Sequence, residues 1–423
     1  MTQRIGTPQL SMMAWLLRSL VENPDRAVSI EEALDVIAAL PGFIDWANLT
    51  AHRDQVERHA LDAAAFERLA SRIRRQFQIA LSPETLSSLL LGVVEQAPQK
   101  IRKSGPFSIA RIAPDYPWLS SIMANAIGQL SELPDFSDDK KIFVMSDFGG
   151  EHASARFYTY SFILLAQDKI GPFEKKVKEL RGKHGLLDQH SEFGYKRGYL
   201  TSGARSRALP EFLQLIDNYI HGAVITVAVE KQIETLFGTS KQEAQASIVE
   251  QLGSMGFGEW KGPDAEKVVR VCHMLAIFVS LMTSSNQRLL WYCDEDAINV
   301  DGNSRNFTGT QKLFTAILGM YATHALDVVG FAKSFQEKSY LDDLLSVADL
   351  AAGVVQDLLQ GHATGENIPG GEEKVQVIQW IARPAPFLSK INIQISRLED
   401  GQVGSGLANF SPRQDAVDPG TEC

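Results

Sequence analysis

The segment KIFVMSDFGGE, residues 141–151, places the strongest constraint on how this 423-residue chain can fold. Four consecutive apolar residues, from Ile142 to Met145, stand between two lysines and a Gly-Gly pair. A short apolar run with such boundaries is typical of a strand that is covered on both faces of its sheet. Asp147 would then lie at the open end of that strand. The segment therefore predicts a buried strand of an α/β protein that presents a carboxylate at a sheet edge.

The composition, with 44% apolar and 22% charged residues, is that of a globular protein, and the length suits two to three domains. The three cysteines are far apart and odd in number, which argues against a disulfide framework and favours a reducing compartment. The first residues lack the pattern of a signal peptide, and no run of about 18 apolar residues occurs. These features predict a soluble, cytoplasmic protein without membrane contact.

The N-terminal region has a helical period from Leu10 to Leu20, and Ser29 followed by early glutamates predicts another helix start. The segment ALDVIAALPGFIDWANLTAH, 33–52, resembles a helical module at one end of some glyoxalase-superfamily proteins. The polar tail from about Ser411 is expected to be disordered. The predicted organisation is a helical accessory domain (1–95), a linker rich in proline and charge (96–140), an α/β core (141–360) with a polar insertion (232–262), and a C-terminal extension with a flexible tail (361–423).

Two further acidic positions match the strand-end Asp147. The predicted strand 288–293 ends on Asp294, Glu295 and Asp296, and either Asp294 or Asp296 could act with Asp147. Asp349 lies beside the apolar stripe of a predicted helix. Burying an unpaired carboxylate costs several kcal/mol, so Asp349 needs a cation, a metal or hydrogen-bond donors. Acids from distant segments that converge are typical of nucleases that bind two magnesium ions, because these ions need hard oxygen ligands.

Four segments carry a resemblance to a known family. They are SVADLAAGVV (346–355), VMSDFGG (144–150), LLWYCDED (289–296) and the Glu-x-x-x-Lys pattern from Glu192 to Lys196. Over about residues 141–360 the chain resembles the "domain of unknown function 3800" family of the ribonuclease H-like superfamily. The resemblance implies a ribonuclease H-like mixed sheet flanked by helices. It departs at Phe148, where the family usually has Glu, and at Ser346, which stands in place of Gln.

The same resemblance implies roles for individual residues. Asp147, Asp294 and Asp349 would bind Mg²⁺ or Mn²⁺, with Glu192 as a fourth catalytic acid and Lys196 near the phosphate. Asp296 is the alternate for Asp294, and Glu151 could supply the acid that Phe148 does not.

The net charge of −10 argues against wholesale wrapping of nucleic acid, but the charge is unevenly distributed. Ten Lys or Arg residues stand against four acidic ones between Lys169 and Arg207. The later ones are predicted to contact nucleic acid phosphates: Lys196, Arg197, Arg205 and Arg207.

The sequence lacks a Gly-x-x-x-x-Gly-Lys phosphate loop, a His-Glu-x-x-His zinc motif and a Gly-x-Ser-x-Gly nucleophile elbow. We therefore predict a divalent-metal-dependent nuclease acting on DNA or RNA, which the family resemblance places in a bacterial or phage-defence context. The N-terminal helices could bind a protein partner. The alternative prediction is a catalytically inactive ribonuclease H-like scaffold that serves in binding or assembly.

Overall fold

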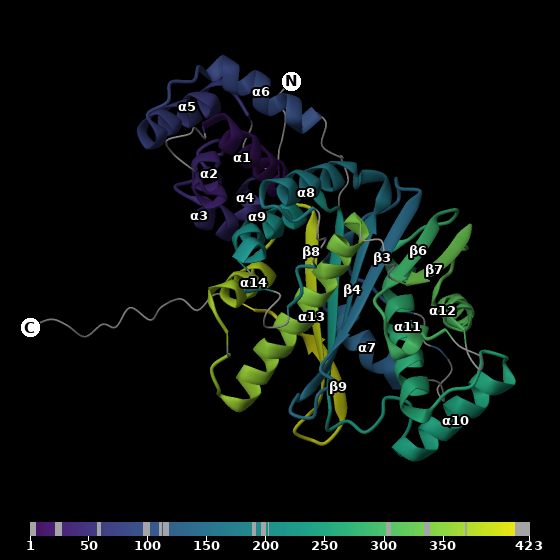
Figure 1. Cartoon of the computed structure of the whole chain (residues 1–423). Helices are drawn as coiled ribbons and strands as arrows, with labels where there is room; N and C mark the ends of the chain where they lie inside the picture. Colours follow the sequence, from purple (N-terminus) through teal and green to yellow (C-terminus); the bar gives the residue numbers. More distant parts are fainter. Residues whose placement is uncertain are drawn as a thin grey trace, which may run out of the picture. The chain divides into compact units, whose positions relative to one another are not determined.

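The structure is a computed structural model that divides into two compact units, Met1–Lys100 and Ile101–Cys423 (Figure 1). Each unit is described by itself. The residues described are 6–21, 28–56, 61–95, 102–109, 112, 118–187, 192–195, 200–201, 203–301, 306–333, 339–368 and 370–410. Lys196, Arg197 and the tail from Ser411 lie outside these residues. Within the described part, none of the helices is both long enough and apolar enough to cross a membrane.

The described residues of the first unit form helices around one apolar core. The helices are α1 (Thr7–Val21), α2 (Ile30–Ile37), α3 (Trp46–Ala51), α4 (Arg53–Val56), α5 (Ala63–Phe77) and α6 (Pro83–Glu95). Ser29 and Glu32 make the reciprocal capping contacts that start α2, and Asp62 caps α5. Leu69, Ile73 and Phe77 of α5 pack into the core, so the opposite face of this helix carries its charged residues.

The second unit is built on a seven-stranded mixed sheet in the order β7-β6-β3-β4-β5-β8-β9. Its strands are β3 (Lys141–Gly149), β4 (Phe157–Ala166), β5 (Gly222–Glu230), β6 (Arg288–Cys293), β7 (Val328–Lys333), β8 (Leu388–Arg397) and β9 (Val403–Leu407). β3 pairs with β4 antiparallel and with β6 parallel, and β4 pairs with β5 antiparallel. β6 pairs with β7 and β5 with β8 in parallel, and β9 is antiparallel to β8. Five strands therefore run in one direction and end at the same edge.

Helices cover both faces of this sheet. They are α7 (Trp118–Gly128), α8 (Gly171–Lys183), α9 (Gly203–Tyr219), α10 (Lys241–Ser254), α11 (Gly262–Met282), α12 (Phe307–Tyr321), α13 (Tyr340–Thr364) and α14 (Glu372–Ala382). One core contains apolar residues of α7, α10, α11 and α12, and the other contains those of α8, α9, α13 and α14. Helix α13 crosses its face of the sheet and packs on β3, β4 and β5 (Figure 1). Short 3-10 helices, η1 (Gln167–Lys169) and η2 (Ala297–Asn299), and a ribbon of β1 (Arg102–Ser104) and β2 (Glu132–Pro134) complete the unit.

Two predicted boundaries are wrong, and the predicted polar insertion contains a helix of the core. The predicted linker 96–140 contains α7, whose Leu119 and Met123 are fully buried in the core of the second unit. The core does not end at residue 360, because β8 pairs with β5 inside the sheet. The polar insertion 232–262 contains α10, which turns Ile248 and Leu252 into the same core as α7. In each case long-range burial decided the structure of a segment whose local composition is polar or interrupted by proline.

Candidate functional site

Strand β3 places Asp147 on the sheet face that α13 covers. Side chains alternate along a strand, and Met145, two residues earlier, is buried in the core on the α13 side. Ser146 faces the other way, where its Oγ accepts a hydrogen bond from Nε1 of Trp291 at 2.8 Å. Asp147 Oδ1 accepts a hydrogen bond from the backbone N–H of Phe148 at 2.8 Å. The orientation of this carboxyl is therefore fixed in part by the strand itself.

Phe148 lies on the opposite face of the sheet from Asp147. Its ring packs against Tyr160 and Phe162, with centroid distances of 5.8 and 6.2 Å. The Nζ of Lys267 stands 5.2 Å from the centroid of the same ring. The position at which the resembled family usually has Glu therefore faces α11 in this chain, away from Asp147.

Asp294 follows the end of β6 beside Asp147. Ser146 and Cys293 are partners in the parallel ladder, and the N–H of Asp294 extends it by donating to the carbonyl of Ser146 at 3.3 Å. Tyr292 is buried on the α13 side, so alternation directs Asp294 to the same side as Asp147. Two acids thus lie next to each other at the carboxyl ends of neighbouring parallel strands.

Helix α13 brings Asp349 to these strand ends. Burial raises the pKa of Asp147 well above its usual value, and the charge of Asp349 and a hydrogen bond to it raise this pKa further. The charge of Asp294 acts in the same direction. Asp349 therefore lies close enough to Asp147 for its charge to oppose the ionisation of Asp147. Asp349 and Asp294 therefore both lie close to Asp147.

The donor atoms of this cluster suit a hard divalent cation, since carboxylate oxygens are the preferred ligands of Mg²⁺ and Mn²⁺. A cation would also offset the repulsion that raises the pKa of Asp147. As the side chains stand, no group of three or more His, Cys, Asp or Glu residues in the described part of the chain is placed to hold a metal ion.

The two alternate acids, Asp296 and Glu151, form ion pairs with a lysine. Nζ of Lys267 on α11 lies 2.6 Å from Oδ2 of Asp296 and also pairs with Glu151. Asp296 in addition accepts the N–H of Ile298 at the start of η2. The structure thus engages Asp296 and Glu151 with Lys267, whereas Asp294 acts on Asp147.

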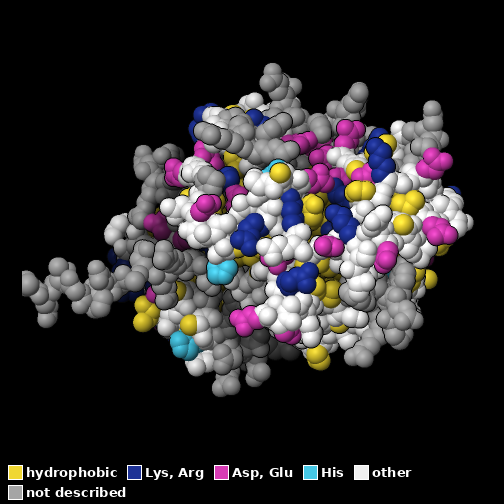
Figure 2. All heavy atoms as spheres, turned by 90° about the horizontal axis from the view of Figure 1, so that it is seen from below, with side chains coloured by type: hydrophobic (Ala, Val, Ile, Leu, Met, Phe, Trp, Pro, Cys, Tyr) yellow, Lys and Arg dark blue, Asp and Glu magenta, His cyan; other side chains and the backbone are white. Residues whose placement is uncertain are grey.

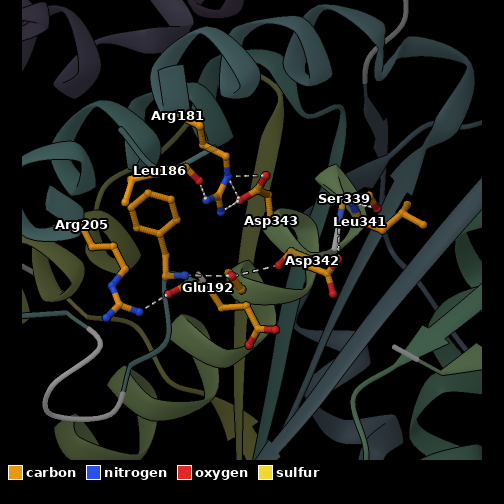
Figure 3. A network of polar contacts seen from close by, with 10 residues as sticks. Arg181, Leu186, Glu192, Arg205, Ser339, Leu341, Asp342 and Asp343 are labelled. Carbon is orange, nitrogen blue, oxygen red and sulfur yellow. Dashed lines mark hydrogen bonds and ion pairs between the residues drawn. The ribbon is translucent and has the colours of Figure 1, made fainter. Parts of the chain in front are cut away.

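A short segment, residues 192–195, runs along α13 and contacts the site. The N–H of Phe193 donates to Ser346 Oγ at 3.3 Å, and the N–H of Tyr195 donates to Asp349 Oδ2 at 2.8 Å. Nη1 of Arg205 donates to the carbonyl of Glu192 at 3.2 Å. Figure 3 shows that the carboxyl group of Glu192 extends away from Arg205, on the side of α13. Ser346, which replaces the Gln of the resembled family, therefore helps to hold the segment that carries Glu192.

A buried ion pair supports the 192–195 segment from α8. Nε of Arg181 lies 3.0 and 3.1 Å from the two carboxyl oxygens of Asp343 (Figure 3). The guanidinium also lies 5.3 Å from the ring centroid of Phe193, which stacks on Phe212 at 4.1 Å. No sequence pattern indicates this pair, because its members are 162 residues apart and Arg181 stands among exposed lysines.

Gly353 on α13 accommodates the ring of Tyr195. A Cβ atom at Gly353 would lie 2.1 Å from the Tyr195 ring, which is far closer than any van der Waals contact. The Tyr195 hydroxyl donates to Asp357 Oδ2 at 2.8 Å, and Nζ of Lys374 lies 4.7 Å from the ring centroid. The Asp and Gly of the segment SVADLAAGVV therefore both contact the 192–195 segment.

We expect Gly353→Ala to destabilise the chain. An alanine inside a helix is ordinarily about 1 kcal/mol more favourable than glycine, but here the new methyl group would displace Tyr195 at a cost of ~1–3 kcal/mol. Thermal melting should show a lower Tm for Gly353→Ala and a higher one for the control Gly319→Ala, whose Cβ would meet open space on α12. In a Tyr195→Ala background the loss should vanish; a loss that persists would show that the ring is not its cause.

Basic side chains surround the connection between β3 and β4. Nζ of Lys231 donates to the carbonyl of His152 at 2.7 Å, and Arg156 lies 3.9 Å from Glu230. Lys267 stands at the same edge, as described above. Figure 2 views the molecule from below Figure 1 and shows Lys and Arg side chains gathered near the middle of that face. Arg207 is exposed on α9.

The comparisons with known proteins give only distant structural matches. No family model matches the chain, and no curated protein matches it. The ribonuclease H2 structure from Pyrococcus horikoshii OT3 is 12% identical, with a TM-score of 0.26, covering 58% of this chain and 91% of that chain. A chain from the complex of PCNA and RNase HII from Archaeoglobus fulgidus is 13% identical, also with a TM-score of 0.26, covering 59% of this chain and 93% of that chain. Similarity of this degree assigns neither a family nor an activity.

Proposed function

We propose that this chain is a divalent-metal-dependent nuclease, which hydrolyses phosphodiester bonds of DNA or RNA on a ribonuclease H-like core. The observation that carries the proposal is the approach of Asp349 and Asp294 to the buried Asp147, with a hydrogen bond between Asp147 and Asp349. Neighbouring acids that repel one another at a sheet edge are typical of functional sites, because a structural role rarely requires such repulsion. Ligands in open α/β sheets bind at the carboxyl ends of the strands, where this cluster lies.

The sheet topology supports the same proposal. The order β5-β4-β3-β6-β7, in which only β4 runs antiparallel to the others, agrees with the ribonuclease H-like core that the family resemblance implies. Helix α13 follows β7 and packs on the central strands, which brings its acid to the strand ends.

Asp147, Asp294 and Asp349 would hold Mg²⁺ or Mn²⁺, and Glu192 would be a further acid of the same site. The ions would supply an activated water and stabilise the leaving oxygen of the phosphodiester. The N–H groups of Phe148 and Tyr195 orient the carboxyl groups of Asp147 and Asp349. Lys267 keeps the neighbouring acids Asp296 and Glu151 paired. We further propose that Lys196, Arg197, Arg205 and Arg207 contact substrate phosphates.

A catalytically inactive scaffold is the second candidate. It is favoured by the hydrogen bond between Asp147 and Asp349, because a shared proton can hold two carboxyl groups together without any cation. A place in bacterial or phage defence, and in the cytoplasm, rests on the sequence predictions alone.

The test is a cleavage assay with single-stranded, double-stranded and RNA–DNA hybrid substrates in Mg²⁺ or Mn²⁺. We expect cleavage of at least one substrate, and a loss of ~100-fold or more in Asp147→Asn and Asp349→Asn, since each variant removes a ligand charge. Asp138→Asn, an exposed acid before β3, is the charge-matched control and should cut like the parent. If the parent cuts no substrate, or if the two site variants retain its rate, the nuclease proposal fails and the scaffold stands.

A further inference from the structure

The first unit contains an open pocket of about 340 Å³ between α5 and the turn that follows α2. Arg68, Arg72 and Arg75 line it from one face of α5, with Gly42 and Phe43 on the other side. Residues spaced by three and four positions share a helix face, so the three arginine side chains extend from the same face of α5. Neither the acidic site nor its resemblance involves this pocket.

Backbone carbonyl groups fix two of these arginines in place. Nε and Nη2 of Arg68 donate to the carbonyls of Ala39 and Leu40 at 3.3 and 2.8 Å. Nη1 of Arg72 alone donates to three carbonyls, those of Asp35, Phe43 and Ile44, at 2.9, 3.2 and 2.7 Å. A guanidinium has five N–H donors in a rigid fork. Within the described residues, Nη1 of Arg68 and Nη2 of Arg72 have no acceptor, so donors remain for a ligand.

The pocket also concentrates positive charge. Glu67 is its one acidic lining residue, against three arginines. The pKa of Arg72 is lowered, first by burial and then by the charge of Arg75, while the charges of Asp35 and Asp45 act in the opposite direction. In the described part of the chain, the exposed Arg75 side chain has neither an ion pair nor a hydrogen bond. An anion between Arg72 and Arg75 would offset their repulsion and accept the remaining N–H groups.

We propose that this pocket binds a phosphate group of a nucleic acid strand. Arginine forks match the tetrahedral oxygens of phosphate, and two anchored guanidinium groups lose little side-chain entropy when they bind. The volume lies at the low end of the range of ~300–1,000 Å³ for ligand sites, which suits one group of a longer chain. That the phosphate belongs to a nucleic acid rests on the proposed function. The first unit is then a nucleic-acid-binding module.

The experiment compares Arg75→Gln with Arg74→Gln in the full chain. Both residues are exposed, lie on α5 and lose the same charge, but only Arg75 lines the pocket. Fluorescence anisotropy with a labelled single-stranded oligonucleotide is measured in EDTA, so that binding is separate from cleavage. We expect Arg75→Gln to weaken binding by at least about threefold and to lower the slope of log K against log salt by ~0.7. Arg74→Gln should bind like the parent.

Equal weakening in both variants, or none in Arg75→Gln, would overturn the proposal, because the pocket would then contribute nothing beyond general charge. Competition by polyglutamate as strong as competition by unlabelled oligonucleotide would also overturn it, in favour of an acidic protein partner. The proposal would likewise be overturned if inorganic phosphate binds the parent without displacing the oligonucleotide. Since no divalent cation is present, a positive result stands even if the chain cuts no substrate, and a negative result leaves the nuclease proposal intact.

Discussion

Asp147→Asn should melt at a higher temperature than the parent at pH 7 in EDTA. The pKa of Asp147 is raised in the folded state, by burial first and by Asp349 second, so the unfolded chain releases this proton at lower pH than the folded chain does. Stability is therefore lost as pH rises from the unfolded pKa of ~3.9 toward the folded one. Asparagine does not titrate, and it removes the repulsion between the charges of Asp147 and Asp349. The gain in Tm should accordingly shrink as the pH is lowered toward 4.

The response to Mn²⁺ should reverse this order. A cation that binds only the folded state stabilises it by about 2.7 kcal/mol when its free concentration is 100 times Kd. The parent should gain that stability, whereas Asp147→Asn should gain little because it lacks one ligand. Asp138→Asn serves as the control, since it removes an exposed carboxylate and should follow the parent in EDTA and in Mn²⁺. A lower Tm for Asp147→Asn in EDTA would mean that the charge of Asp147 is favourably paired. An equal gain with Mn²⁺ in both proteins would place the cation elsewhere.

Local patterns predict the strands that matter for the site. The apolar runs that precede Asp147 and Asp294 form β3 and β6. A short apolar run with polar or glycine boundaries favours a buried strand. Alternation then accounts for both acids facing α13. It also accounts for Phe148, whose side chain faces the other way and packs against Tyr160.

Other features depend on pairings between distant segments. The segment INIQIS, 391–396, has the alternating pattern of a strand, but nothing local indicates its place between β5 and β9, since strand order has no local signal. The ion pair of Asp296 is equally hidden, because its partner Lys267 reaches it from α11. The contact of Tyr195 with Asp349 crosses 154 residues and involves a backbone N–H that every residue type could supply. Such contacts follow from the packed fold, which sequence patterns alone do not specify.

Arg181→Met should cost ~3–5 kcal/mol of unfolding free energy, the largest stability effect that we expect from a single substitution here. Arg181 and Asp343 are only 2% and 1% exposed, so the substitution would leave a buried carboxylate without its guanidinium. Urea denaturation should therefore show a large loss for Arg181→Met and for Asp343→Leu. The double variant should recover most of it, because two apolar side chains of similar volume can replace a buried pair at little cost.

Lys183→Met, on the same helix, is the matched control, because its pair with Glu211 is 64% and 37% exposed and should contribute less than about 1 kcal/mol. An Arg181→Met cost no larger than that of Lys183→Met would show that the buried pair is not what holds α8 to α13. The pair also bears on the site, because the Arg181 guanidinium lies against Phe193 and the next residues lead to Tyr195 and Asp349. If the double variant regains stability but not the response to Mn²⁺, the guanidinium has a second role. It then positions the 192–195 segment, which an apolar pair cannot do, since only the planar cation both packs on Phe193 and donates to the carbonyl of Leu186.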